Sequence, residues 1–218
     1  IIEPNDVFGQ GSFIDSQGTV LPYRYYLPET YNPNKKYPLL LYLHGLGSRG
    51  DDNTTQLTSS GAAVVKKIIN GVYKEDIIIL APQCPAGEQW VASGKYPGSS
   101  EYDPQEPMST YLSAAWELMH KTISDYNIDR SRIYATGSSN GGGAVWSLAA
   151  RNPEFFAAII PLAGTGETGG AATIAESLAS TPIWTFHGDA DEILSVEGTR
   201  QLVAAISEVG GNIIYTEL

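Results

Sequence analysis

The sequence predicts an α/β protein whose central sheet is mostly parallel and carries helices on both faces. Short apolar runs alternate with segments of helical period along the chain, and this alternation is typical of βαβ units. The runs at 39–43 and 77–81 are apolar without interruption, as expected of strands that are buried on both faces. A chain of 218 residues with this pattern is expected to form one domain over 1–218.

Seven segments are expected to be strands. The segment 20–27 alternates in polarity, and the runs that follow it are short and apolar. In chain order the seven strands are 20–27, 39–43, 77–81, 133–136, 157–162, 183–186 and 213–216.

Four further segments have apolar residues at helical spacing. They lie at 57–69, 108–123, 144–150 and from 195 onward. Asn70 and Gly71 are expected to end the first helix. Ser195 is expected to cap the last helix, with Gly210 as part of its terminator.

Two segments rich in turn-forming residues, 93–107 and 164–170, are expected to be surface loops. The connection 164–181 is only 18 residues long and is rich in glycine, alanine and threonine. No large lid domain is therefore expected over the site. Tyr96 and Tyr102 in the first loop are candidates for contact with a phenolic or sugar group, and the alternative is that both rings simply pack.

Composition excludes several classes of function. There are 13 Lys and Arg against 24 Asp and Glu, so a net charge of −11 would repel a nucleic acid backbone. No apolar run approaches the roughly 18 residues of a membrane span, so no membrane partner is expected. Cys84 is the one cysteine, which allows no internal disulfide and does not indicate a metal site. Ile1 in place of a methionine indicates a processed or excised product, which leaves room for an additional domain outside this sequence.

The pentapeptide Gly137-Ser138-Ser139-Asn140-Gly141 is the strongest chemical signal in the chain. This G-x-S-x-G pattern directly follows an expected strand and opens an expected helix, which is the setting of a nucleophile elbow. The turn is expected to pack closely against neighbouring backbone, where side chains in place of the two outer glycines would collide. Such a turn would hold Ser139 out at the carboxyl end of the sheet. The alternative is a glycine-rich turn with an idle serine.

His44-Gly45-Leu46-Gly47 follows another expected strand, where the second half of an oxyanion hole would lie. Acyl transfer needs two donors aimed at the developing oxyanion, and the backbone N–H groups of Leu46 and Asn140 are the natural pair. The alternative is a plain turn after a strand, with His44 satisfied locally.

The segment 187–191, HGDAD, also follows an expected strand and comes after the serine. An acid on this loop would orient a catalytic imidazole, and the chain order of serine, acid and histidine is known for this kind of sheet. Asp191, Asp189 and Glu192 are all candidates. The alternative is an acidic surface turn.

The general base is not evident from the motifs. The three histidines are His44, His120 and His187, and none of them follows Asp191. His120 is expected to be a solvated or half-buried helix residue. His44 and His187 are expected near the site as structural residues.

These motifs together resemble those of the α/β-hydrolase esterases that include polyhydroxybutyrate depolymerases, feruloyl esterases and predicted peptidases. The matching stretches are LPYRYYLP (21–28), YP (37–38) before LHG (43–45), RGDDN (49–53), APQCP (81–85) with QW (89–90), NID (127–129) with RIY (132–134), the serine pentapeptide with Gly142 and Trp146, and HG (187–188) with Asp191. The resemblance implies the α/β-hydrolase fold, with Ser139 as nucleophile and Leu46 and Asn140 as oxyanion donors. It favours Asp191 over Asp189 as the acid.

The resemblance also identifies one further residue and two departures. Trp90 matches an aromatic residue near the substrate cleft, and a buried core position would suit it equally. Asn140 stands where the family usually carries methionine, so its side chain is expected to alter the pocket. Relatives carry their catalytic histidine after the strand at 213–216, which by alignment falls roughly five residues beyond Leu218. We therefore expect that the sequence lacks a short C-terminal segment with this histidine, and the alternative is a pseudoenzyme.

These features predict a serine carboxylesterase that hydrolyses short-chain or polymer-linked acyl esters through an acyl-enzyme on Ser139. The chemistry needs no metal or organic cofactor, and the expected partner is a small-molecule or polymer-linked ester. A serine peptidase would use the same residues. A noncatalytic hydrolase-like module that binds a ligand in the former cleft is the remaining alternative. The resemblance also implies a secreted or extracytoplasmic protein.

Overall fold

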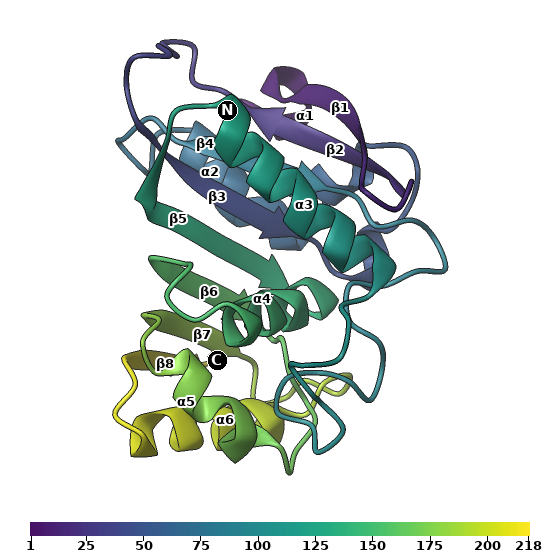
Figure 1. Cartoon of the computed structure of the whole chain (residues 1–218), viewed down its shortest axis with the longest axis vertical. Helices are drawn as coiled ribbons and strands as arrows, with labels where there is room; N and C mark the ends of the chain where they lie inside the picture. The colour runs from purple at the N-terminus through teal and green to yellow at the C-terminus, as the bar shows by residue number, and fades with distance from the viewer.

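The structure, a computed structural model, describes residues 1–218 and contains an eight-stranded sheet. Figure 1 shows the strands in the spatial order β1-β2-β4-β3-β5-β6-β7-β8. Their bounds are β1 Gly9–Ile14, β2 Val20–Tyr26, β3 Tyr37–Leu43, β4 Ile78–Pro82, β5 Ile128–Ser138, β6 Ala158–Leu162, β7 Ile183–His187 and β8 Ile213–Glu217. β1 and β2 pair antiparallel, and every pair from β4 to β8 is parallel, so the expected mostly parallel sheet is confirmed.

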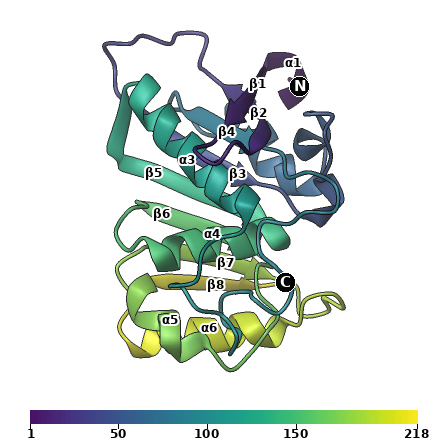
Figure 2. The ribbon, with the colours of Figure 1, turned by 45° about the vertical axis from the view of Figure 1, so that its right-hand side comes forward.

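Helices cover the two faces of the sheet unequally. They are α1 Pro4–Val7, α2 Ala63–Ile69, α3 Thr110–Asp125, α4 Asn140–Arg151, α5 Ala171–Leu178 and α6 Val196–Glu208, with the short 3-10 turns η1 Leu46–Ser48, η2 Thr55–Leu57 and η3 Ser60–Ala62. α3, α4, α5 and α6 lie on one face and enclose the larger apolar core, whereas α2 packs on the other face against β3 and β4 (Figures 1 and 2). No helix combines the length and the apolar character needed to cross a bilayer.

The α2 face remains uncovered over the last three strands. The register pairs Trp184 with Ile214, and Ile160 lies on the same face of the neighbouring strand. These side chains are 45%, 56% and 37% exposed, respectively. We call the surface formed by Ile160, Trp184 and Ile214 the open face.

Local signals explain several of the element boundaries, although the helix expected from residue 57 begins only at Ala63, after two 3-10 turns. β3 is buried at every position, as its continuous apolar run predicts. Gly71 and Gly210 have φ values of 84° and 78°, which favour glycine and end α2 and α6 as expected. The Ser195 hydroxyl accepts the N–H of Glu197 and caps α6.

Several elements are missing from the sequence prediction, and β1 and α5 are the longest of them. β1 has the composition GQGSFI, which carries little strand signal. It forms because Gly9 and Gly11 let the rings of Tyr25 and Tyr23 on β2 lie directly over its backbone. α5 lies in the connection 164–181, where no helix was expected, and packs against α4 and α6. No lid-sized domain is present over the carboxyl edge of the sheet.

The segments 90–103 and 163–170, which we call the rim loops, are joined to one another. The Glu167 carboxylate accepts the N–H groups of Gly94 at 2.8 Å and Tyr96 at 3.1 Å. Tyr96 and Tyr102 are 5% and 8% exposed, so both rings pack inside the protein.

Candidate active site

Ser139 lies in the tight turn between β5 and α4. Its backbone has φ 53° and ψ −122°, a combination that residues other than glycine seldom adopt. Its N–H donates to the Leu162 carbonyl on β6 at 2.9 Å, and its carbonyl accepts the N–H of Gly143 at 3.0 Å. The strained turn is therefore held from both sides, while the Ser139 side chain keeps partial exposure.

The two outer glycines of the pentapeptide are required by close approach of the backbone. A Cβ built on Gly141 would lie 2.0 Å from the Leu43 carbonyl oxygen, and one built on Gly137 would lie 2.6 Å from the same atom. No side chain fits at such distances. The end of β3 thus packs directly against the turn that carries Ser139, in the strand-turn-helix arrangement of a nucleophile elbow.

Leu46 and Asn140 each begin a helical turn, η1 and α4 respectively. Backbone N–H groups at this position have no acceptor within the helix. The two segments meet beside the serine, because a Cβ built on Gly45 would lie 3.4 Å from the Ser139 Cβ. The structure therefore brings both expected oxyanion donors to the turn that holds Ser139.

His44 is buried beneath the Leu46 segment, with 1% of its surface exposed. Its Nε2 accepts the N–H of Cys84 at 2.9 Å, so Nδ1 carries the proton and donates to the Gly45 carbonyl at 2.7 Å. That carbonyl belongs to the same planar peptide unit as the Leu46 N–H, so the imidazole fixes the direction of this donor. Burial is the main cause that lowers the pKa of His44 to about 4, which keeps the ring neutral near pH 7.

Trp90 is buried beside His44 and Asn140, with 1% of its surface exposed. Its indole Nε1–H donates to the His44 carbonyl at 3.0 Å, and its backbone N–H donates to Oδ1 of Asn140 at 2.8 Å. So little free surface favours the buried alternative for Trp90 over contact with substrate. The hydrogen bond between the Asn140 side chain and Trp90 was not predicted from the sequence. The one feature of the sequence that pointed to it is a polar residue at a position where the family usually has methionine.

Asp191 lies in the loop after β7. Its Oδ1 accepts the N–H groups of Ile193 at 2.8 Å and Leu194 at 3.0 Å, and its Oδ2 lies 3.4 Å from Nε2 of His187. Burial by itself would raise the pKa of Asp191, but the two amides and the imidazole outweigh it and lower the pKa below its ordinary value. The carboxylate is therefore ionised near pH 7 and is held in one orientation.

The other two acidic candidates, Asp189 and Glu192, are exposed. Neither side chain makes a hydrogen bond, whereas the Asp191 side chain makes two. The loop thus orients one carboxylate out of three.

His187 ends β7 and is 1% exposed. Its Nε2 lies 2.9 Å from the Leu194 carbonyl oxygen, which can only accept, and its Nδ1 lies 2.7 Å from the Thr199 hydroxyl. Both ring nitrogens are therefore engaged inside the fold, as are those of His44.

His120 lies on α3 and packs against Trp116 and Phe155, with ring centroids 4.7 Å and 5.4 Å away. α3 leads into the start of β5, so it runs away from the carboxyl edge of the sheet. Ten residues of helix carry His120 about 15 Å along this direction. None of the three histidines presents a free ring nitrogen to Ser139.

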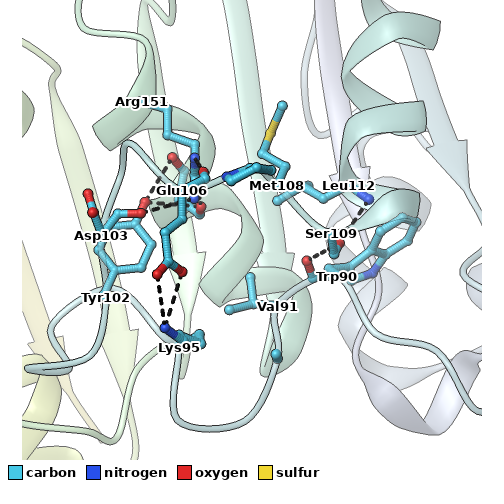
Figure 3. Close-up of a pocket in the computed structure, with 13 residues that line it drawn as sticks. Trp90, Val91, Lys95, Tyr102, Asp103, Glu106, Met108, Ser109, Leu112 and Arg151 are labelled. Carbon is cyan, nitrogen blue, oxygen red and sulfur yellow. Dashed lines mark hydrogen bonds and ion pairs between the residues drawn. The ribbon is translucent and has the colours of Figure 1, made fainter. Parts of the chain in front are cut away.

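A cavity of about 270 Å³ lies beside the rim loops, between the start of α3 and the end of α4 (Figure 3). In its wall Nζ of Lys95 forms an ion pair with Oε2 of Glu106 at 3.1 Å, and the Arg151 guanidinium donates to the Pro104 carbonyl at 2.8 Å. Ser139 and Asp191 do not line it, so it is separate from the catalytic candidates. No three His, Cys, Asp or Glu side chains converge as ligands for a metal ion.

Comparison with known proteins gives a consistent assignment. The family model described as "Putative esterase" matches residues 16–204. A solved structure of a thermostable esterase is 37% identical with a TM-score of 0.82, and the match covers 97% of this chain and 54% of that chain. Dipeptidyl-peptidase 5 of Porphyromonas gingivalis is 33% identical over 144 residues, which are 63% of this chain and 18% of that protein. A bifunctional acetylxylan esterase/xylanase of Neocallimastix patriciarum is 26% identical over 182 residues, which are 83% of this chain and 23% of that protein.

The chain spans about a fifth of the length of these two curated relatives and about half of the solved esterase chain. The family match includes the Leu46 segment, the serine turn and the Asp191 loop. The mostly parallel sheet with its flanking helices agrees with the α/β-hydrolase fold of the solved esterase. The chain belongs to this esterase family.

Proposed function

We propose that this chain is the catalytic part of a serine carboxylesterase that hydrolyses short-chain or polymer-linked acyl esters. The observation that carries the proposal is the strained turn that holds Ser139 beside the first N–H groups of η1 and α4. A serine in this setting is typical of acyl transfer through a covalent intermediate. Membership of the esterase family supports the same conclusion.

In this mechanism the Ser139 hydroxyl attacks the ester carbonyl carbon while a general base takes its proton. The N–H groups of Leu46 and Asn140 stabilise the negative charge on the carbonyl oxygen. The base then protonates the leaving alcohol, and an acyl-enzyme remains on Ser139. Water, activated by the same base, releases the acid. Asp191 orients the protonated base and stabilises its charge.

We propose that the base is a histidine that follows Leu218. β8 ends beside the acidic loop, because the Leu218 N–H donates to the His187 carbonyl at 3.0 Å and its carbonyl accepts the Asp189 N–H at 2.9 Å. Ser139 and the Asp191 loop follow β5 and β7, which are two strand spacings or roughly 10 Å apart. An imidazole bonded to both groups would fit between them.

Two observations support small or polymer-linked acyl groups. No lid-sized domain restricts entry from the carboxyl edge, and one relative is named as an acetylxylan esterase. Polymers cannot enter a cell intact, so we propose an extracytoplasmic location. Recovery of esterase activity from the culture medium of the native host would test it.

A serine peptidase is the second candidate, because a relative at 33% identity is named dipeptidyl-peptidase 5. The same groups would act on an amide. Its amine is a poorer leaving group, so its departure depends more strongly on protonation by the catalytic base. Turnover of matched p-nitrophenyl esters and dipeptidyl p-nitroanilides separates the two, and we expect the esters to react faster.

The decisive experiment measures hydrolysis of p-nitrophenyl acetate and butyrate by the protein that its gene encodes, beside Ser139→Ala and residues 1–218 alone. We expect turnover that falls at least about 10⁴-fold in Ser139→Ala and by about 10⁴ to 10⁶-fold without the proposed histidine. Full Ser139-dependent turnover by residues 1–218 would retain the esterase and reject the position of the base. Absence of turnover from the gene-encoded protein would reject the esterase.

A further inference from the structure

The two proposed oxyanion donors belong to different segments of the chain. Leu46 follows β3 and Asn140 follows β5, and these strands are paired only as far as Leu43 and Gly137. The donors themselves lie beyond the last paired residues. Because oxyanion donors act only when placed within about 0.5 Å of the productive geometry, other contacts must fix their separation.

Trp90 makes hydrogen bonds to both segments. Its backbone N–H donates to Oδ1 of Asn140 at 2.8 Å, and its indole Nε1–H donates to the His44 carbonyl at 3.0 Å. The Trp90 carbonyl accepts the Ser109 hydroxyl at 2.7 Å, which anchors it to the start of α3 (Figure 3). Trp90 and His44 are each 1% exposed and Asn140 is 0% exposed, so water does not compete for these bonds.

The Asn140 amide is fully used in this contact. Its Nδ2 donates to the Val91 carbonyl at 2.7 Å and to the Tyr96 hydroxyl at 2.8 Å. The reversed amide would place Nδ2 against the Trp90 N–H, donor against donor, so the orientation is unambiguous. An apolar side chain at position 140 could make none of these bonds.

We propose that Trp90 is a positioning residue of the oxyanion hole, which acts with the Asn140 side chain as a bridge between the two donor segments. This inference rests on the proposed esterase function. The bridge holds the Leu46 and Asn140 N–H groups at one separation, so it matters most when negative charge develops between them. Its loss should weaken the transition state more than the binding of substrate.

The test compares Trp90→Phe with a matched control, Tyr102→Phe, in the gene-encoded protein. Trp90→Phe keeps an aromatic ring and removes the donor to the His44 carbonyl. Tyr102→Phe removes a hydroxyl that lies 3.1 Å from the Ser147 hydroxyl. This buried bond joins the same loop to α4 seven residues beyond Asn140, and Tyr102 makes no hydrogen bond to Asn140, His44 or Leu46. β-(3-Benzothienyl)alanine at position 90 is a second variant, since it keeps the bicyclic shape and replaces the N–H with sulfur.

Both position-90 variants are expected to lower kcat for p-nitrophenyl butyrate by about 10 to 100-fold, with KM within about threefold of wild type. The inhibition constant of butaneboronic acid, which forms a tetrahedral adduct on the serine, should rise by the same factor as kcat/KM falls. Inhibition by the product butyrate should stay unchanged. Asn140→Leu should act similarly, and its combination with Trp90→Phe should cost less than the sum of the two.

Wild-type kcat in the benzothienyl variant would overturn the proposal, as would equal losses of kcat in Trp90→Phe and Tyr102→Phe. Should Trp90→Phe fail to fold, the benzothienyl variant decides. If the wild-type protein itself lacks Ser139-dependent turnover, the esterase proposal fails together with this one. If the wild-type protein shows Ser139-dependent turnover and the position-90 variants do not lose it as expected, only this inference fails and the esterase proposal stands.

Discussion

The residues around Ser139 differ in which of their polar atoms are still free. Both ring nitrogens of His44 and of His187 are bonded inside the fold. Asp191 uses Oδ1 for two backbone amides and leaves Oδ2 with only the His187 ring at 3.4 Å. An ionised, oriented carboxylate with a free oxygen is the group that can hold another imidazole.

Asp191→Asn is therefore expected to lower kcat for p-nitrophenyl butyrate by about 10³ to 10⁴-fold, because the amide cannot stabilise a protonated base. Steady-state kinetics of the gene-encoded protein measure the effect. Asp189→Asn is the matched control, since its exposed side chain makes no hydrogen bond, and it should retain activity. A larger loss in the control would transfer the role of the acid to Asp189.

His44 is expected to make stability depend on pH. The unfolded chain takes up a proton near pH 6.5, while burial and the nearby charge of Arg49 help to keep folded His44 neutral down to about pH 4. The folded pKa is the lower one, so this contribution to stability is intact above pH 6.5 and falls as the pH drops towards 4. The loss amounts to about 3 kcal/mol.

Urea denaturation of wild type and His44→Gln at pH 7 and pH 4 isolates this effect, since carboxylates titrate in both proteins. The free energy of unfolding should fall by about 3 kcal/mol more in wild type than in the variant. Equal pH dependence in the two proteins would contradict the buried neutral imidazole.

At the scale of elements, the start of α4 is packed unusually close to its neighbours. Besides Gly141 against Leu43, a Cβ on Gly142 would lie 2.7 Å from the Leu162 carbonyl oxygen. The ends of β3 and β6 therefore both touch the first turn of α4. This packing holds Ser139 in its strained conformation.

Gly141→Ala is expected to lower the free energy of unfolding by at least about 3 kcal/mol or to prevent folding, because the added Cβ meets backbone that cannot move aside. Gly47→Ala is the matched control, as nothing lies within 4 Å of its Cβ position. Urea denaturation followed by circular dichroism compares them. Coincident unfolding curves would show that the turn can relax.

At the scale of the whole molecule, charge and apolar surface oppose each other. A net charge of −11 keeps copies of the chain apart, whereas the open face presents large apolar side chains. Salt shortens the range of the charge repulsion, from about 10 Å at 0.1 M ionic strength to about 3 Å at 1 M, and leaves the apolar attraction intact.

Residues 1–218 are therefore expected to self-associate more strongly in 1 M than in 0.05 M sodium chloride, because the range of the charge repulsion is several-fold shorter at the higher concentration. Ile214→Thr should weaken this association by about five to tenfold and leave the free energy of unfolding nearly unchanged. Sedimentation equilibrium measures both proteins. Val72→Thr, an exposed apolar site outside the open face, should behave as wild type, and equal effects of the two substitutions would exclude the open face as the cause.

The sequence by itself determined the fold class, seven of the eight strands and the turn at Ser139, because these follow from short-range periodicity and from the space that glycine leaves. Only the tertiary structure decided what the polar side chains do. Trp90, His44 and Asn140 lie 46 to 50 residues apart in sequence where they bond, and no local pattern encodes such contacts. β1 was likewise decided by its partner, since tyrosine rings of β2 cover a backbone that has little preference of its own.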